Sequence, residues 1–408
     1  MSKETRHFSK DALHKYLKRK PLLIALIALL ILLLIGSGLG VFALVNRQGN
    51  QALANQLVGH AYLESSGQFV EYSTNGINDN LHLALHGIPG PARDNAYYLW
   101  LLSDKQQKPT TAIALGQVQV NAGNVDAHFT TAQHTNLIAT TSRLLITEEK
   151  TGPVPGSFSS DPHTWRYYAE IPQTTPSPGA PYISALYYMR FLLFESNKMV
   201  AQGLHGGHAF RMQSSTQKVL EWASSARGDW EMKNFALMHR HFIRILDYLD
   251  GSAYVQADLP PGTPLLVDPL LAQNGLITVV PGENPEAYLP RVAFSVLSFA
   301  ESANTLSPEK HQLAIETEKD IRVNLSSQLQ AVRQATKELV VMSDEQLAQR
   351  STLPLLNNLL ALANYAYAGH FDPITGHLQG GALNDYNLIQ NIASFDIYPC
   401  PGTQCTVK

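Results

Sequence analysis

The chain has 408 residues with 30 basic and 33 acidic side chains, and 45% of its residues are hydrophobic, which is enough for sizeable cores. Seven basic and only two acidic residues lie in the first twenty positions, so the remainder carries a net charge of about −8. An acidic remainder without a cluster of Lys and Arg argues against nucleic acid and anionic lipid surfaces as its partners.

The first feature in chain order is an uncharged apolar run from Leu22 to Val45, which follows the basic tail at residues 1–20. A helix rises about 1.5 Å per residue, so this run is long enough to cross a hydrocarbon core of about 30 Å. A cleaved signal peptide is the alternative, but its apolar core usually has about 7 to 15 residues. The sequence therefore predicts a transmembrane helix at 21–45.

The flanks of this run predict its orientation. Lys and Arg near a span stay on the cytoplasmic side, so the tail at 1–20 is expected inside and the C-terminal part outside, at a bacterial cell membrane. The lipid bilayer is thus the expected partner of residues 21–45. Gly36, Gly38 and Gly40 could also let two spans pack as a homodimer. Residues 46–59 are interpreted as a tether to the ectodomain.

Residues 60–171 and the positions just before them show short runs of alternating apolar and polar residues separated by turn residues. Such runs are typical of antiparallel strands, and about eight of them at close spacing predict a β-sandwich. The runs are Gly59 to Leu63, Gly67 to Ser73, Asn80 to His86, Ala96 to Leu102, Ala112 to Val120, Val125 to Phe129, Arg143 to Glu148 and Thr164 to Ile171.

Three segments of this region, HLALHGIPGPARDNAYYLWLLSD, ALGQVQVNAGNV and SRLLITEEKTGPVPGS, resemble the extracytoplasmic domain of anti-sigma-K-type factors. The residues that carry the resemblance are Tyr97, Leu99, Trp100, Leu115, Gly116, Glu148 and Glu149. The resemblance implies a β domain outside the membrane in a single-pass protein. Such regulators also hold a sigma factor through a cytoplasmic zinc-containing domain with a His-x3-Cys-x2-Cys motif. Because residues 1–20 contain no cysteine, sequestration of a sigma factor in cis is not expected.

The rest of the chain is predicted to be helical after a stiff linker. Residues 172–181, PQTTPSPGAP, contain closely spaced prolines, which restrict the backbone and block both helix and sheet. Apolar residues then recur at intervals of three and four through 182–368, which predicts an α-helical domain, and residues 369–408 are expected to be loop-like. The predicted fold class is thus a single-pass transmembrane helix plus an α+β ectodomain, an antiparallel β-sandwich followed by an α-helical bundle.

The two cysteines of the chain, Cys400 and Cys405, lie close together near its end. Outside the cytoplasm they would close a disulfide around a Pro-Gly turn. An exposed redox pair or an intermolecular bridge is the alternative.

Four histidines are the candidate metal ligands of the helical region. They are His205 and His208 in GLHGGH, and His239 and His241 in MHRH. Neutral imidazole is the commonest metal ligand, so two pairs from neighbouring helices could hold a transition metal. However, the glycines between the first two interrupt a helix, and the second two face different sides of one. Structural roles for all four are the alternative.

No catalytic motif appears in the sequence; a Gly-x-Ser-x-Gly nucleophile elbow, for example, does not occur. We therefore expect no enzymatic activity and no resident cofactor. The predicted function is a membrane-anchored, extracytoplasmic sensing or protein-interaction module with an unidentified protein partner. The alternative is a helical ectodomain that binds a metal or cofactor through the four histidines.

Overall fold

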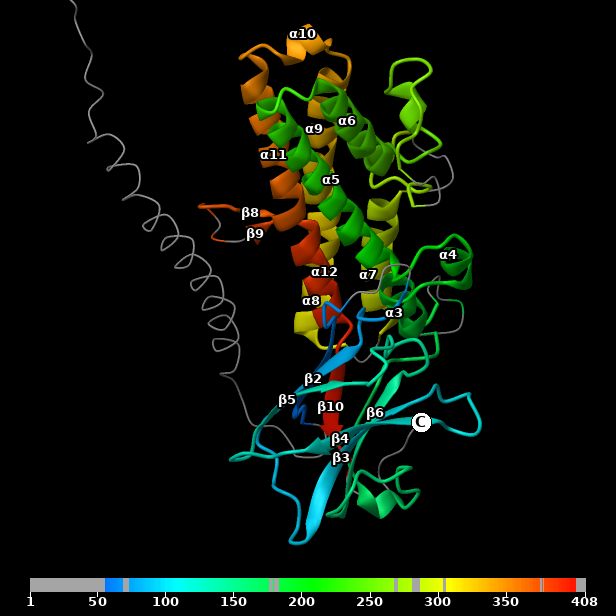
Figure 1. Ribbon diagram of the computed structural model, residues 1–408. Helices are drawn as coiled ribbons and strands as arrows, with labels where there is room; N and C mark the ends of the chain where they lie inside the picture. The colour runs from blue at the N-terminus through cyan, green and yellow to red at the C-terminus, as the bar shows by residue number, and fades with distance from the viewer. Residues whose placement is uncertain are drawn as a thin grey trace, which may run out of the picture. The chain divides into compact units, whose positions relative to one another are not determined.

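The computed structural model describes residues 56–68, 73–175, 179, 183–267, 271–280, 287–303, 306–374, 376 and 378–400. From Leu57 onward the chain forms one compact unit, in which helices pack on one side of a curled sheet (Figure 1). A single hydrophobic core continues from the sheet into the helices, and it includes Leu83 of the sheet and Phe242 of the helices.

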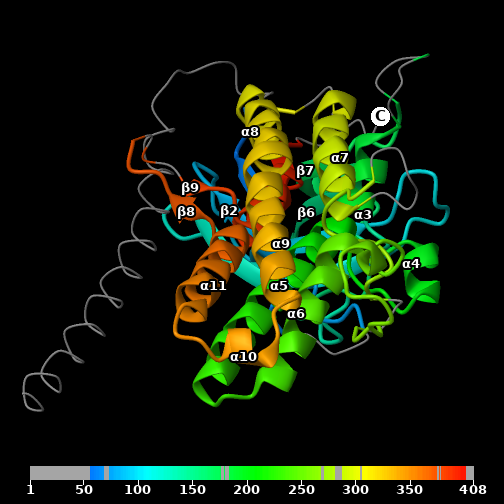
Figure 2. The same ribbon diagram turned by 90° about the horizontal axis from the view of Figure 1, so that it is seen from above.

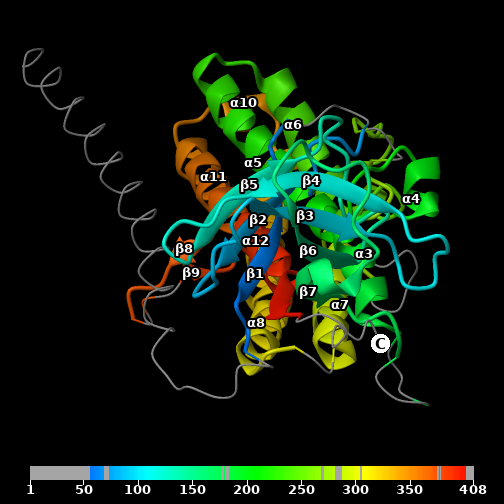
Figure 3. The same ribbon diagram turned by 90° about the horizontal axis from the view of Figure 1, so that it is seen from below.

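The sheet has eight strands, and all neighbouring pairs run antiparallel. The strands are β1 (Gly59–Glu64), β2 (Asn80–Leu85), β3 (Asn95–Leu102), β4 (Ala112–Val118), β5 (Val125–Thr130), β6 (Arg143–Lys150), β7 (Trp165–Glu170) and β10 (Phe395–Pro399). Their order across the sheet is β4-β3-β6-β7-β10-β1-β2-β5. The view in Figure 3, from the sheet side, shows these strands in front of the helices.

Alternation of side chains explains which face of the sheet is buried. In β1, Ala61 and Leu63 point into the core, whereas His60, Tyr62 and Glu64 are only partly buried. This period of two is the pattern of a strand with one covered face. The sheet also curls, so that its two edge strands approach each other. A Cβ added to Gly116 of β4 would lie only 3.4 Å from the Phe129 ring of β5, at the opposite edge.

The helices follow β7 in the sequence and return to the sheet at the end of the chain. They are α3 (Ala185–Leu193), α4 (Asn197–Ala201), α5 (His208–Glu231), α6 (Phe235–Asp250), α7 (Tyr288–Ser302), α8 (Pro308–Lys319), α9 (Ser326–Val340), α10 (Asp344–Leu347), α11 (Thr352–Ala368) and α12 (Ala382–Ile392). Figure 2 shows α5, α6, α9 and α11 grouped together, with α7 and α8 beside them.

Local sequence signals set the helix boundaries. Ser307 caps α8 by accepting a hydrogen bond from the Lys310 backbone N–H, and Pro308 occupies the first turn, where its missing N–H costs nothing. The π-helical turn η3 (Asp320–Leu325) joins α8 to α9. Helices α8 and α9 thus follow each other directly, with this irregularity between them.

The C-terminal region is the largest departure from the predicted domain organisation. Residues 369–408 were expected to be loop-like, but they contain the short hairpin β8 (His370–Phe371) and β9 (Leu378–Gln379), then α12, then β10. Strand β10 lies between β1 and β7, so the predicted β-sandwich at 60–171 is wrong as a separate domain. One continuous sheet replaces it, because β10 joins the strands on its two sides.

The expected membrane topology is also corrected. No helix in the described residues is both long and apolar enough to cross a bilayer. The predicted span at 21–45, with the tail at 1–20 and most of the tether at 46–59, lies outside the described residues. We therefore no longer assign the chain a single-pass transmembrane fold, an extracytoplasmic location or a homodimer through a span.

Candidate functional site

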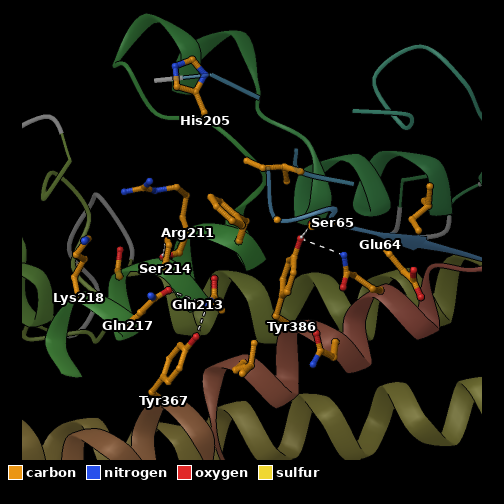
Figure 4. A pocket seen from close by; sticks show the side chains of 18 of the residues that line it. Glu64, Ser65, His205, Arg211, Gln213, Ser214, Gln217, Lys218, Tyr367 and Tyr386 are labelled. Carbon is orange, nitrogen blue, oxygen red and sulfur yellow. Dashed lines mark hydrogen bonds between the residues drawn. The ribbon is translucent and has the colours of Figure 1, made fainter. Parts of the chain in front are cut away.

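A groove of about 1040 Å³ lies where the end of β1 meets helices α5, α11 and α12 (Figure 4). Its wall on the sheet side comes from the segment that joins β1 to β2. The residues that line it are Leu63, Glu64, Ser65, Gly67, Ser73, Ile77, Gly203, His205, Phe210, Arg211, Gln213, Ser214, Ser215, Gln217, Lys218, Tyr248, Leu271, Tyr367, Leu383, Tyr386, Asn387, Gln390 and Asn391.

Helix α5 supplies the longest wall of this groove. Arg211, Ser214, Ser215 and Lys218 are spaced by three and four residues, so one face of the helix presents all of them. Gln213, beside them, donates a hydrogen bond to the Tyr367 hydroxyl of α11 at 3.2 Å, which links the two helices across the groove (Figure 4). The wall is therefore polar and held in place from the opposite helix.

Two buried nitrogen atoms in the groove have no hydrogen-bond partner in the described part of the chain. They are Nε of Arg211 and Nδ1 of His205. A buried polar group usually has a partner, because leaving it unpaired costs about 1–3 kcal/mol. Lys218, the other cation of the wall, already contacts Glu221 at 2.7 Å. Arg211 is thus the charge of this wall that remains available for a ligand.

The floor of the groove is a network centred on Asn78, which is fully buried and has a left-handed backbone with φ of 49°. The Asn78 amide donates to the Leu193 carbonyl at 2.8 Å and accepts from the Gln390 amide of α12 at 2.8 Å. Its backbone N–H donates to Ser65 Oγ at 3.1 Å. Asn78 therefore ties the segment after β1 to α3 and α12 through its backbone N–H and its side chain.

Tyr386 adds a hydroxyl to this floor. The Tyr386 hydroxyl oxygen lies 3.3 Å from Ser65 Oγ. A dashed line marks this contact in Figure 4. Burial raises the pKa of Tyr386 to about 12, so the hydroxyl stays neutral and can both donate and accept. Glu64 and His205 are far apart among the labelled side chains of Figure 4 and do not form an acid–base pair there. The Tyr386 hydroxyl is therefore a neutral hydrogen-bonding group of the groove.

The structure does not bring the four predicted metal ligands together. His205 lines the groove, whereas His208 begins α5, stacks on Phe191 with ring centroids 3.9 Å apart, and contacts the Phe191 carbonyl through Nδ1 at 3.1 Å. Burial lowers the pKa of His208 to about 4, which keeps its ring neutral. Both contacts are those of a structural histidine.

The other pair lies on α6 and faces two different partners. His239 Nε2 lies 3.3 Å from the exposed Asp344 carboxylate. His241 Nε2 lies 3.0 Å from Asp229, and its ring stacks on Trp222. In the described residues the cluster of three side chains with metal-ligand geometry lies elsewhere, on the sheet.

Cys400 is disulfide-bonded, and it is 3% exposed beside β7, where its backbone N–H donates to the Arg166 carbonyl at 2.6 Å. Its predicted partner, Cys405, lies outside the described residues. Cys400, one of the two cysteines of the expected disulfide, thus directly follows β10.

Of the predicted site residues only His205 lines the groove, and sequence reasoning did not predict the groove itself. Its residues come from six stretches of the sequence, at 63–77, 203–218, 248, 271, 367 and 383–391, so no local motif marks them. The one available signal was the polar face of α5, where Arg211, Ser214 and Lys218 replace the apolar residues expected of a buried bundle helix.

Comparisons of the chain with protein-family models, with curated proteins and with solved structures found no match.

Proposed function

We propose that this protein is a protein-interaction module whose groove binds an extended, acidic peptide segment of a partner protein. The observation that carries the proposal is the Arg211 guanidinium, a charged group inside the groove whose buried Nε has no partner in the described residues. A carboxylate from a ligand would pair with this guanidinium, because a planar guanidinium matches carboxylate geometry.

The remaining groove chemistry fits a peptide backbone. Gln217, Asn387 and Asn391 each offer an amide that can donate to a carbonyl and accept from an N–H. Tyr367 and Tyr386 add flat side chains of the kind enriched at protein interfaces. The groove, at about 1040 Å³, has a volume at the upper end of the range for ligand pockets, about 300–1,000 Å³.

The resemblance of residues 60–171 to the outer domain of anti-sigma-K-type factors supports the same class of function. In that family the β domain is a regulatory part of the protein rather than an enzyme. The proposal does not depend on where the chain resides.

A peptide-library experiment tests the proposal. The full-length chain is immobilised and exposed to random twelve-residue peptides, half of them containing Asp or Glu at central positions, and the retained peptides are sequenced and titrated. We expect acidic peptides to be enriched. Arg211→Gln should weaken the best of them about tenfold to a hundredfold, since hydrogen bonds to a charged group contribute about 1.5–3 kcal/mol.

The matched control is Arg350→Gln, which removes the same charge from an exposed position away from the groove. It should leave peptide affinity unchanged. The proposal fails if no peptide is retained above background, or if Arg211→Gln binds the enriched peptides as tightly as the unmodified chain.

A further inference from the structure

Three strands at one edge of the sheet present a set of polar side chains on their outer face. Strands β1, β2 and β5 are neighbours, and their registers place His82 opposite both Tyr62 and His128. Glu64 and Asp126 occupy the diagonal positions on either side of His82. Because alternate residues share a face, all of these side chains point away from the core.

Glu64, His82 and His128 converge so closely that one ligand atom from each lies within 4.8 Å of the others. Oε1 of Glu64 is 3.5 Å from His82 Nδ1, and Oε2 of Glu64 is 3.3 Å from His128 Nδ1. In a tetrahedral zinc site with bonds of 2.0–2.1 Å, neighbouring ligand atoms are about 3.3 Å apart. The two separations from Glu64, each measured to a different oxygen of its carboxylate, are close to that edge length.

Asp126 and Asn80 hold this set in orientation. Asp126 Oδ1 lies 2.7 Å from Nε2 of His82, so a proton on Nε2 leaves Nδ1 of that ring free as a ligand atom. A carboxylate behind a histidine is the usual outer partner of a zinc ligand. The Asn80 amide donates to Glu64 Oε2 at 3.2 Å, and Thr130 donates to Asn80 at 3.1 Å.

We propose that Glu64, His82 and His128 form a binding site for a divalent transition metal, with Zn²⁺ as the best match. Two imidazoles and one carboxylate are a typical three-ligand zinc set, which leaves the fourth position to water or to a group from a bound ligand. Asp126 is a positioning residue of this site. The inference does not rest on the groove, although Glu64 also stands at its rim.

Metal binding requires a small rearrangement of the two rings. They now stack with centroids 4.3 Å apart and an interplanar angle of 12°, so their Nδ1 lone pairs lie in nearly parallel planes. Rotation about χ2 of each ring would turn both lone pairs toward Glu64. The side chains have room for this, because that of His82 is 25% exposed and that of His128 is 55% exposed.

Zinc titration of the full-length, metal-stripped chain against a chromophoric chelator tests the site. We expect one equivalent of zinc to bind, and Co²⁺ in its place to give the intense visible bands of four-coordinate geometry. Glu64→Gln and His128→Gln should each weaken binding at least tenfold and remove the cobalt bands. Asp126→Asn should weaken zinc binding while keeping the bands, as a positioning role requires.

His163→Gln is the control, since this exposed histidine lies on the distant η1 turn (Pro162–Thr164). It should bind zinc as the unmodified chain does. Substoichiometric zinc binding overturns the proposal, and so does binding that survives both ligand substitutions. Binding lost in His205→Gln but kept in His128→Gln would place the metal elsewhere and would equally overturn it. All the substituted ligands are at the surface, so the variants are expected to fold.

Discussion

At the scale of single residues, the carboxyl groups of Asp320 and Asp385 lie close together at the π-helical turn. Asp385 of α12 is 0% exposed, and neither of its carboxyl oxygens has a hydrogen-bond partner in the described part of the chain. Asp320 accepts from the Gly380 backbone N–H at 3.1 Å. Burial, with the neighbouring Asp320 carboxyl, raises the pKa of Asp385 well above its ordinary value.

Asp385 is therefore expected to contribute less to the stability of the fold as the pH rises. In the folded chain Asp385 keeps its proton above pH 4, whereas in the unfolded chain it loses the proton near its ordinary pKa of about 3.9. The contribution of Asp385 to the free energy of unfolding therefore falls from about pH 4 upward until its folded pKa is passed. Each pKa unit between the two states corresponds to about 1.4 kcal/mol.

Asp385→Asn should remove much of this pH dependence. The amide stays neutral in both states, so we expect the variant to be more stable than the unmodified chain at pH 8 and less different from it at pH 4. Urea unfolding at several pH values measures this, with the exposed Asp94→Asn as the control. A variant that is less stable at pH 8 would contradict the prediction.

At the scale of elements, strand β10 is held by one buried ion pair at its start. The Lys310 ammonium of α8 contacts the Asp396 carboxylate and also donates to the Ser394 carbonyl at 3.0 Å, and His60 of β1 lies 2.8 Å from the same carboxylate. Burial alone would raise the pKa of Asp396, but the His60 hydrogen bond and the Lys310 charge lower it below its ordinary value. These contacts join a helix to two strands.

Lys310→Met should therefore loosen β10. It leaves the Asp396 carboxylate, 12% exposed, without its cation, and breaking a buried pair in this way costs about 3–5 kcal/mol. We expect a loss of stability of that order and faster hydrogen exchange at Phe395–Pro399. Lys218→Met, which breaks a surface pair, is the matched control and should cost at most about 1 kcal/mol. Equal effects of the two substitutions would argue against the role of Lys310.

The elements that sequence reasoning found are those defined by local pattern. The runs Asn80 to His86, Ala96 to Leu102 and Arg143 to Glu148 became β2, β3 and β6 with end shifts of at most two residues. In β3, Tyr97 and Trp100 belong to two different apolar clusters, so both faces of this strand are buried. Period and turn residues are visible in a short window, so such elements can be predicted.

The missed element and the missed sites depend on distant parts of the chain. The run Phe395–Pro399 alternates like other strands, but its partners β1 and β7 precede it by more than two hundred residues. The groove and the Glu64, His82 and His128 cluster likewise need the register of several segments, which only the tertiary fold determines. The close spacing of His239 and His241 in the sequence instead suggested a metal site there, but these two side chains face separate partners.

At the scale of the whole molecule, β10 is hydrogen-bonded to strands of two groups, β1-β2-β5 and β4-β3-β6-β7, and so joins them into one sheet. Truncation after Ile392 should therefore abolish cooperative unfolding, because it exposes the edges of β1 and β7 and the apolar positions that Phe395 and Ile397 cover. Truncation after Cys405 keeps both β10 and the two cysteines, and it serves as the control. Calorimetry of both truncated chains tests this prediction. A single sharp unfolding transition of the chain that ends at Ile392 would contradict it.

The late position of β10 also bears on how the protein is made. A ribosome adds about 5–20 residues per second, so roughly half a minute separates the emergence of β1 from that of its neighbour β10. Until β10 emerges, the nascent chain carries two incomplete sheets with unpaired strand edges. The production of the protein in cells should accordingly depend on chaperones that shield these edges until translation ends.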